Sequence, residues 1–225
     1  MGLALAPTTA SPGETAMRTV LCYGDSNTWG YIPGTGGRYP AHVRWPGVLR
    51  GELGEGYTVL EEGLNGRTTV WEDPIEGFKN GKTYLIPCLE THRPLDLVVV
   101  MLGTNDLKKR FSLTAYDIAD GAGTLVGIIQ RSQCGPDGAS PRVLLVAPPP
   151  LGKLTRLAEM FEDGTEKSRR LAEQYRRVAG EYGCDYLDTA GLVVSSDLDG
   201  IHLAAEAHQC LGRLAASRIK EIYRN

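Results

Sequence analysis

The chain of 225 residues lacks an excess of positive charge, and no apolar run in it reaches the length of a membrane span. It holds 24 Lys and Arg residues against 27 Asp and Glu residues, which gives a formal net charge of −3. Nucleic-acid-binding domains usually carry a basic excess or a stripe of Lys and Arg, and a transmembrane helix needs about 20 apolar residues. We therefore expect neither a nucleic-acid nor a membrane partner, and we interpret the basic run at 108–110 as a solvated face.

The sequence also lacks the spacings of a metal or disulfide framework. Its cysteines are odd in number and form no CxxC motif: Cys22, Cys88, Cys134, Cys184 and Cys210. This pattern argues against a zinc site and a full set of disulfides. No two of the four histidines have metal-ligand spacing, so we expect no metal-dependent hydrolase. Unpaired cysteines are typical of a reducing compartment, which favours a cytoplasmic location.

The first 16 residues (MGLALAPTTASPGETA) have no basic segment, and a proline interrupts their short apolar stretch. These features do not fit a signal peptide. We expect residues 1–16 to be a disordered leader, or translation to begin at Met17. The rest, 17–225, shows no repeat and no linker, and its length fits a single domain.

From Met17 onward, short apolar runs alternate with amphipathic segments. Continuous β-branched runs are typical of strands buried on both faces of a parallel sheet, and strand–helix alternation predicts an α/β fold with right-handed crossovers. The predicted strands are 19–23, 58–60, 95–102, 143–147 and 185–187, and the predicted helices are 44–53, 82–91, 114–132, 165–182 and 204–223.

Polar residues follow these predicted strands, at the edge of the sheet where α/β proteins bind ligands. Ser26 follows the first strand, Gly66 the second and Asn105 the third, while Asp199 and His202 precede the last helix. A serine hydroxyl needs a base to become a nucleophile. His202 can be that base, and Asp199 can hold its ring in the correct tautomer. The N–H groups of Ser26 and Gly66 and the amide of Asn105 are our candidates for an oxyanion hole.

Each of these segments, taken alone, has an ordinary structural explanation. Asp25 and Ser26 both cap helices well, and Gly66 could serve only a positive φ angle. Their occurrence together, in order, at successive strand ends favours an acyl-transfer site. We expect Asp25 and Asp106 to tie down their turns by hydrogen bonds, and His208 to lie on the surface of the last helix.

The polar segments resemble the four blocks of the SGNH/GDSL hydrolase family: Gly24-Asp25-Ser26, the Gly66 region, Gly103-Thr104-Asn105-Asp106 and Asp199-Gly200-Ile201-His202. Further segments are similar to its mycobacterial arylesterase–acyltransferase branch: Val43-Arg44-Trp45, Glu61-Glu62-Gly63-Leu64 and Arg67-Thr68-Thr69. The resemblance covers nearly everything from Met17 onward. It implies a single-domain, flavodoxin-like, three-layer sandwich around a five-stranded parallel sheet, with no cofactor. It also implies a homo-oligomer that hydrolyses short-chain carboxylic esters, including aryl esters, or passes the acyl group to an alcohol.

One residue departs from the family pattern: Asn27 stands where leucine is common, and we expect it to change the lining of the acyl pocket. We also expect the long segments 27–43 and 148–164 to wall the pocket and take part in subunit contacts, although their apolar residues could equally pack back onto the domain. Those residues are Trp29, Tyr31, Tyr39, Leu151, Leu154, Leu157, Met160 and Phe161. Two other functions stay open: a carbohydrate O-deacetylase with the same triad, and a non-catalytic flavodoxin-like module that binds a phosphate or nucleotide.

Overall fold

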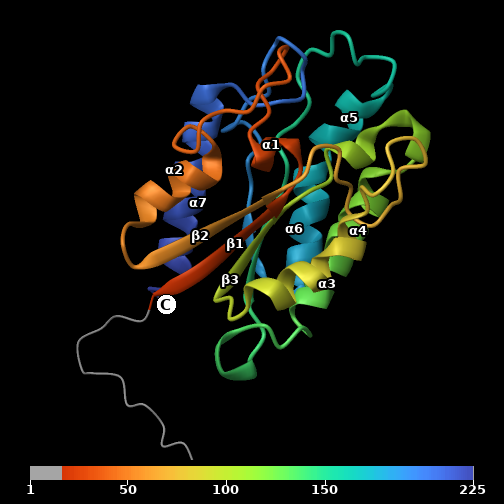
Figure 1. Cartoon of the computed structure of the whole chain (residues 1–225). Helices are drawn as coiled ribbons and strands as arrows, with labels where there is room; N and C mark the ends of the chain where they lie inside the picture. Colours follow the sequence, from red (N-terminus) through yellow and green to blue (C-terminus); the bar gives the residue numbers. More distant parts are fainter. Residues whose placement is uncertain (1–16, 225) are drawn as a thin grey trace, which may run out of the picture.

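Five parallel strands form the centre of the molecule (Figure 1). The computed structural model describes residues 17–224, so the predicted leader at 1–16 lies outside the described residues. The strands pair in the order β2-β1-β3-β4-β5. They are β1 Arg18–Gly24, β2 Tyr57–Gly63, β3 Leu97–Met101, β4 Arg142–Val146 and β5 Asp185–Leu187. The predicted α/β class and five-stranded parallel sheet are therefore confirmed.

Helices cover both faces of this sheet, as the three-layer prediction requires (Figure 1). On one face, α2 (Trp45–Leu53) packs against α7 (Ala205–Ile222). On the other face, α4 (Ala115–Ile129) lies between α3 (Gly81–His92) and α6 (Leu171–Tyr182). Within the described residues, no helix is both long and apolar enough to cross a membrane.

The central strands are apolar throughout because both of their faces are buried. Leu21 and Tyr23 of β1 pack in the core with α3, α4 and α6. Their neighbours Val20 and Cys22 point the other way, into the core with α2 and α7. Successive side chains of a strand face opposite sides, so a strand between two helical layers contains no polar alternation. Packing on both faces thus fixes the positions of the carboxyl ends of the central strands, where the site residues lie.

Two elements differ from the sequence prediction. The expected helix at 165–182 is divided into α5 (Gly164–Arg169) and α6, because the chain turns at Arg170. Within α5, the Ser168 hydroxyl accepts a hydrogen bond from the Leu151 N–H at 3.0 Å. A four-residue helix, α1 (Ser26–Trp29), follows β1 directly and is too short to produce a periodic pattern.

The prediction for His208 is wrong. This residue of α7 is fully buried between α7 and α2. Its Nδ1 accepts a hydrogen bond from the Trp45 N–H at 3.2 Å. Trp45 opens α2, and the Arg44 side chain before it makes no capping bond. His208 therefore satisfies one of the unpaired N–H groups that every helix start exposes. Burial lowers the pKa of His208 to about 4, so the ring is neutral at pH 7.

The buried imidazole makes stability depend on pH. In the unfolded chain a histidine binds a proton below pH ~6.5, whereas folded His208 binds one only below about 4. Acid therefore favours the unfolded state through this interval. Between pH 7 and pH ~4.5, we expect the wild type to lose roughly 2–3 kcal/mol more unfolding free energy than His208→Gln. Urea unfolding of both proteins at the two pH values measures this difference, and equal losses would contradict the buried neutral state.

Candidate active site

The predicted nucleophile stands on a tight turn at the carboxyl end of β1. Ser26 is the first residue of α1, and the Asp25 carboxylate before it accepts a hydrogen bond from the Asn27 N–H at 2.9 Å. Gly24 has no room for a side chain: a Cβ there would collide with the Thr28 side chain. The strand can therefore turn sharply into the helix and present the Ser26 hydroxyl at the sheet edge, where the residue is 5% exposed.

His202 lies between Ser26 and Asp199. Its Nε2 is 3.0 Å from Ser26 Oγ, and its Nδ1 is 2.8 Å from Asp199 Oδ2. The other carboxylate oxygen accepts the backbone N–H groups of Ile201 and His202, each at 2.9 Å. Burial alone would raise the pKa of Asp199, but the hydrogen bonds from the ring and the two amides hold it at about 2. An ionised Asp199 favours the tautomer with the proton on Nδ1, which leaves Nε2 free to accept the serine proton.

The three candidate oxyanion donors come together in one cavity. Ser26, Gly66, Asn105 and His202 all line a hollow of about 220 Å³, while Asp199 lies buried behind it. Asn105 Nδ2 donates one hydrogen bond to the Arg67 carbonyl at 3.1 Å, and a primary amide carries two hydrogens, so the second is available. Gly66 has φ +81°, a backbone conformation that residues with a side chain rarely adopt. The backbone conformation therefore favours glycine at this position beside the pocket.

The prediction that Asp25 and Asp106 anchor their turns is confirmed. The Asp106 carboxylate accepts the Thr69 N–H at 3.0 Å and the Thr69 hydroxyl, which ties the segment after β2 to the end of β3. Burial raises the pKa of both Asp25 and Asp106 to about 6. Through these hydrogen bonds, the buried Asp25 and Asp106 carboxyl groups fix the segments that carry Ser26, Asn105 and the loop after β2.

The long segments supply part of the pocket wall. The Tyr31 ring stacks on the His202 ring, with centroids 4.0 Å apart and planes at 25°. Its hydroxyl accepts a hydrogen bond from Arg156 at 3.2 Å. The predicted wall residues that line the cavity are Tyr31, Leu157, Met160 and Phe161, whereas Trp29, Tyr39, Leu151 and Leu154 do not line it. Tyr39, for example, packs edge-on against His208 instead.

Comparison with known proteins identifies the family of this site. Residues 22–210 match the GDSL-like lipase/acylhydrolase family. The chain belongs to this family. Ester hydrolysis is therefore its chemistry, in agreement with the sequence prediction.

Two solved structures show how similar other GDSL-like hydrolases are. A carbohydrate acetylesterase from Sinorhizobium meliloti is 42% identical, with a TM-score of 0.88; the match covers 91% of this chain and 99% of that one. The aryl esterase of M. smegmatis is 39% identical, with a TM-score of 0.87 and the same coverages of 91% and 99%. The predicted likeness to the mycobacterial branch is thus confirmed. A comparison with curated proteins found no match.

Asn27 stands where leucine is common in the family, but it does not change the lining of the cavity beside Ser26. The residue is 2% exposed and is not part of the cavity wall, so the expected change in pocket lining is wrong. Its Nδ2 donates to the Ile201 carbonyl at 3.3 Å, and its Oδ1 accepts the Leu203 N–H at 3.1 Å. Asn27 therefore fixes the backbone on both sides of His202 to the helix that carries Ser26.

Charged residues that the sequence analysis did not single out also line the cavity of this GDSL-like hydrolase. Lys108 was predicted to be solvated but is only 3% exposed, because its Nζ contacts Glu76 Oε1 at 2.5 Å and Asp73 Oδ2 at 3.3 Å. Burial would raise the pKa of Asp73, yet backbone hydrogen bonds and the Lys108 cation hold it at about 2. A basic run in a loop gives no sign of such pairing, since its partners lie more than 30 residues away.

One group of side chains in the described residues could hold a metal ion. Glu62, Cys88 and His92 place one potential ligand atom each within 4.8 Å of one another. His92 Nε2 already lies 2.8 Å from Glu62 Oε1, and burial raises the pKa of the Cys88 thiol to about 12. The sequence spacing of these residues gave no such indication, because β2 and α3 bring them together only in the fold.

Substitution of Asn27 tests its bracing of the catalytic loop. Asn27→Leu, the residue common in the family, would leave the Leu203 N–H and the Ile201 carbonyl without these partners. We expect the unfolding free energy to fall by about 1–3 kcal/mol, and kcat on phenyl acetate to fall while KM stays close to that of the wild type. Urea unfolding and steady-state kinetics measure both. A changed KM with an unchanged kcat would contradict this role and indicate that Asn27 contacts the substrate.

Proposed function

We propose that the protein is a serine esterase in which Ser26, His202 and Asp199 form the triad. Its substrates would be short-chain carboxylic esters, including aryl esters. The observation that carries the proposal is the hydrogen-bonded row from Ser26 Oγ through the His202 ring to the Asp199 carboxylate, with its two distances of 3.0 and 2.8 Å. The small cavity beside Ser26 supports short acyl chains.

In the first half-reaction, Ser26 Oγ attacks the ester carbonyl while His202 Nε2 takes its proton. The carbonyl electron pair moves to oxygen, and the N–H groups of Ser26 and Gly66 with the Asn105 amide bind the negative charge. Asp199 stays ionised, because its pKa is about 2, and stabilises the protonated ring. His202 then gives its proton to the leaving oxygen as the C–O bond breaks, which leaves an acyl group on Ser26.

In the second half-reaction, water or an alcohol attacks the acyl group. Its proton passes to His202 Nε2, and the same donors hold the second oxyanion. Ser26 then leaves and recovers its proton from the ring. The apolar wall formed by Leu157, Met160, Phe161 and Ile201 disfavours water near the acyl group. This wall supports acyl transfer to alcohols as well as hydrolysis.

A carbohydrate O-deacetylase is the second candidate. It is supported by the 42% identity to a carbohydrate acetylesterase and by the polar side chains of Glu76, Lys108 and Arg156 around the cavity, which could bind sugar hydroxyls. The phosphate- or nucleotide-binding module has less support, because such a module has no use for an aspartate–histidine pair directed at a serine.

We further propose that the hydrolase domain spans residues 17–225 and assembles as a homo-oligomer in the cytoplasm. All five cysteines are free thiols in the structure, and three of them are buried. Free thiols persist best in a reducing compartment.

Removal of the nucleophile tests the triad. We expect Ser26→Ala to lower kcat on phenyl acetate by about 10⁴-fold or more without loss of thermal stability. A serine-directed phosphonate or sulfonyl fluoride should add one adduct to the wild type and none to the variant, as measured by intact-protein mass. Retained turnover in Ser26→Ala would remove Ser26 from the mechanism.

The preferred alcohol part of the ester substrate, phenol or sugar, distinguishes the arylesterase from the deacetylase. If the protein is primarily an arylesterase, kcat/KM for phenyl acetate should exceed that for acetylated sugars with the same acyl group. Side-by-side initial rates on phenyl acetate and acetylated xylose measure the ratio, with Ser26→Ala as the blank. A ratio in favour of the sugar ester would select the deacetylase.

A further inference from the structure

One buried polar atom in the cavity beside Ser26 has no hydrogen-bond partner. Asn65 lines this cavity, and its side-chain oxygen Oδ1 is buried without a hydrogen bond from any described residue. Among the described residues that line the cavity, no other buried side-chain oxygen or nitrogen lacks a partner. Buried acceptors are normally satisfied in folded proteins, and an unsatisfied one costs free energy. An open acceptor in a catalytic cavity therefore indicates a donor that the substrate supplies.

The turn that contains Asn65 does not use this oxygen. Asn65 and Gly66 are the central residues of the turn, which the Arg67 N–H closes by donating to the Leu64 carbonyl at 3.0 Å. An asparagine in a turn commonly accepts a hydrogen bond from the backbone two residues further on. That N–H belongs to Arg67 and is already engaged. The backbone conformation is therefore held without the Asn65 oxygen.

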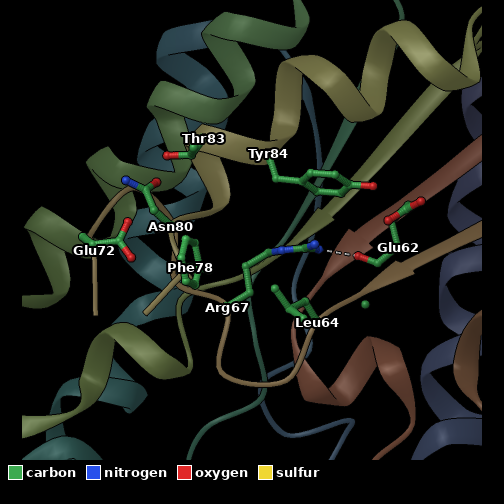
Figure 2. Close-up of a pocket in the computed structure, with 9 residues that line it drawn as sticks. Glu62, Leu64, Arg67, Glu72, Phe78, Asn80, Thr83 and Tyr84 are labelled. Carbon is green, nitrogen blue, oxygen red and sulfur yellow. Dashed lines mark hydrogen bonds between the residues drawn. The ribbon is translucent and has the colours of Figure 1, made fainter. Parts of the chain in front are cut away.

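Hydrogen bonds fix the backbone on both sides of Asn65. The Leu64 N–H donates to the Gly24 carbonyl at 3.1 Å, and the Arg67 guanidinium donates to the same carbonyl at 2.9 Å. Figure 2 shows the other hydrogen bond of this guanidinium, to the Glu62 carbonyl, with the Leu64 side chain beside it. The position of the Asn65 side chain at the cavity therefore follows from a well-anchored segment.

The charged side chains of the cavity already have partners in the chain. Lys108 Nζ contacts the carboxylates of Asp73 and Glu76. Arg156 donates to the Tyr31 hydroxyl at 3.2 Å. Since no donor of the described residues reaches the open acceptor oxygen, its hydrogen bond has to come from the bound ester.

We propose that Asn65 Oδ1 accepts a hydrogen bond from a free hydroxyl on the alcohol part of the ester, close to the bond that is cleaved. This inference rests on the proposed function and deepens it by naming a substrate class. The peptide group between Asn65 and Gly66 carries the Gly66 N–H, a candidate oxyanion donor, so the Asn65 side chain begins next to the scissile carbonyl. An acetyl group has no donor of its own. The preferred substrates are therefore monoesters of neighbouring hydroxyls, as in a partly acetylated sugar, rather than esters of alcohols without a donor.

Two esters of similar size distinguish a hydroxyl contact from a better fit. 2-Hydroxyethyl acetate carries the proposed donor, whereas 2-fluoroethyl acetate has a fluorine in its place, which cannot donate a hydrogen bond. Fluorine also makes the alcohol the better leaving group, so a preference for the hydroxyl ester cannot arise from the chemistry of the ester bond. We expect the wild-type kcat/KM to be about 10-fold or more higher for the hydroxyl ester.

Variants at position 65 assign this preference to the side-chain oxygen. Asn65→Leu has a similar volume without an acceptor, and the ratio of the two kcat/KM values should fall to about 1. Asn65→Asp retains an acceptor oxygen and should retain the preference. A distorted turn at Gly66 would lower both rates together and leave the ratio unchanged. Arg156→Met is the matched control on the cavity wall, and its ratio should equal that of the wild type.

Three outcomes would overturn the proposal: a wild type that hydrolyses both esters with the same kcat/KM, the same ratio in the wild type and Asn65→Leu, or loss of the preference in Arg156→Met alone. A failure of the Ser26 assignment would appear separately, as turnover of phenyl acetate that Ser26→Ala retains. Circular dichroism and thermal melts establish that the variants fold, and the wild-type ratio tests the proposal without any variant.

Discussion

The Asp199 carboxylate, ionised although fully buried, organises the carboxyl edge of the sheet. One oxygen holds the backbone amides of Ile201 and His202, and the other holds the His202 ring. A buried charge is costly unless hydrogen bonds satisfy it, so this short loop has little freedom to take another shape. The orientation of the His202 ring, and the position of its Nε2 beside Ser26 Oγ, therefore follow from the hydrogen bonds that the buried Asp199 carboxylate needs.

The catalytic cavity is assembled from separate parts of the chain, and the scaffold decides where these parts meet. Ser26 and Asn105 follow neighbouring strands, β1 and β3, and Gly66 follows the other neighbour, β2. Buried hydrogen bonds then join the three segments: Asp106 holds Thr69, and the Arg67 carbonyl holds the Asn105 amide. Such cross-links explain why the loop after β2 is well fixed at its inner side although its outer side exposes apolar residues.

The sequence predicted the parts of this arrangement that local patterns encode. Apolar runs predicted the sheet, because β1 and β3 are buried on both faces, and residue order at strand ends predicted the grouping of Ser26, Gly66, Asn105, Asp199 and His202. The short α1 and the break at Arg170 were missed, since neither changes the hydrophobic periodicity. The burial of His208 and Lys108 was missed for another reason: their partners Trp45, Asp73 and Glu76 are distant in sequence, and only tertiary packing pairs them.

The two hydrogen bonds of Asn27 join segments that lie 174 and 176 residues apart in the sequence. Helix α1 carries Ser26, the 201–203 strip carries His202, and one amide side chain joins their backbones. A chain with leucine at this position has to satisfy the same two backbone groups by other means. Because both partners are main-chain groups, nearly any residue at 201 or 203 offers them, and the demand on side-chain chemistry falls on position 27 alone: a short side chain that carries both a donor and an acceptor.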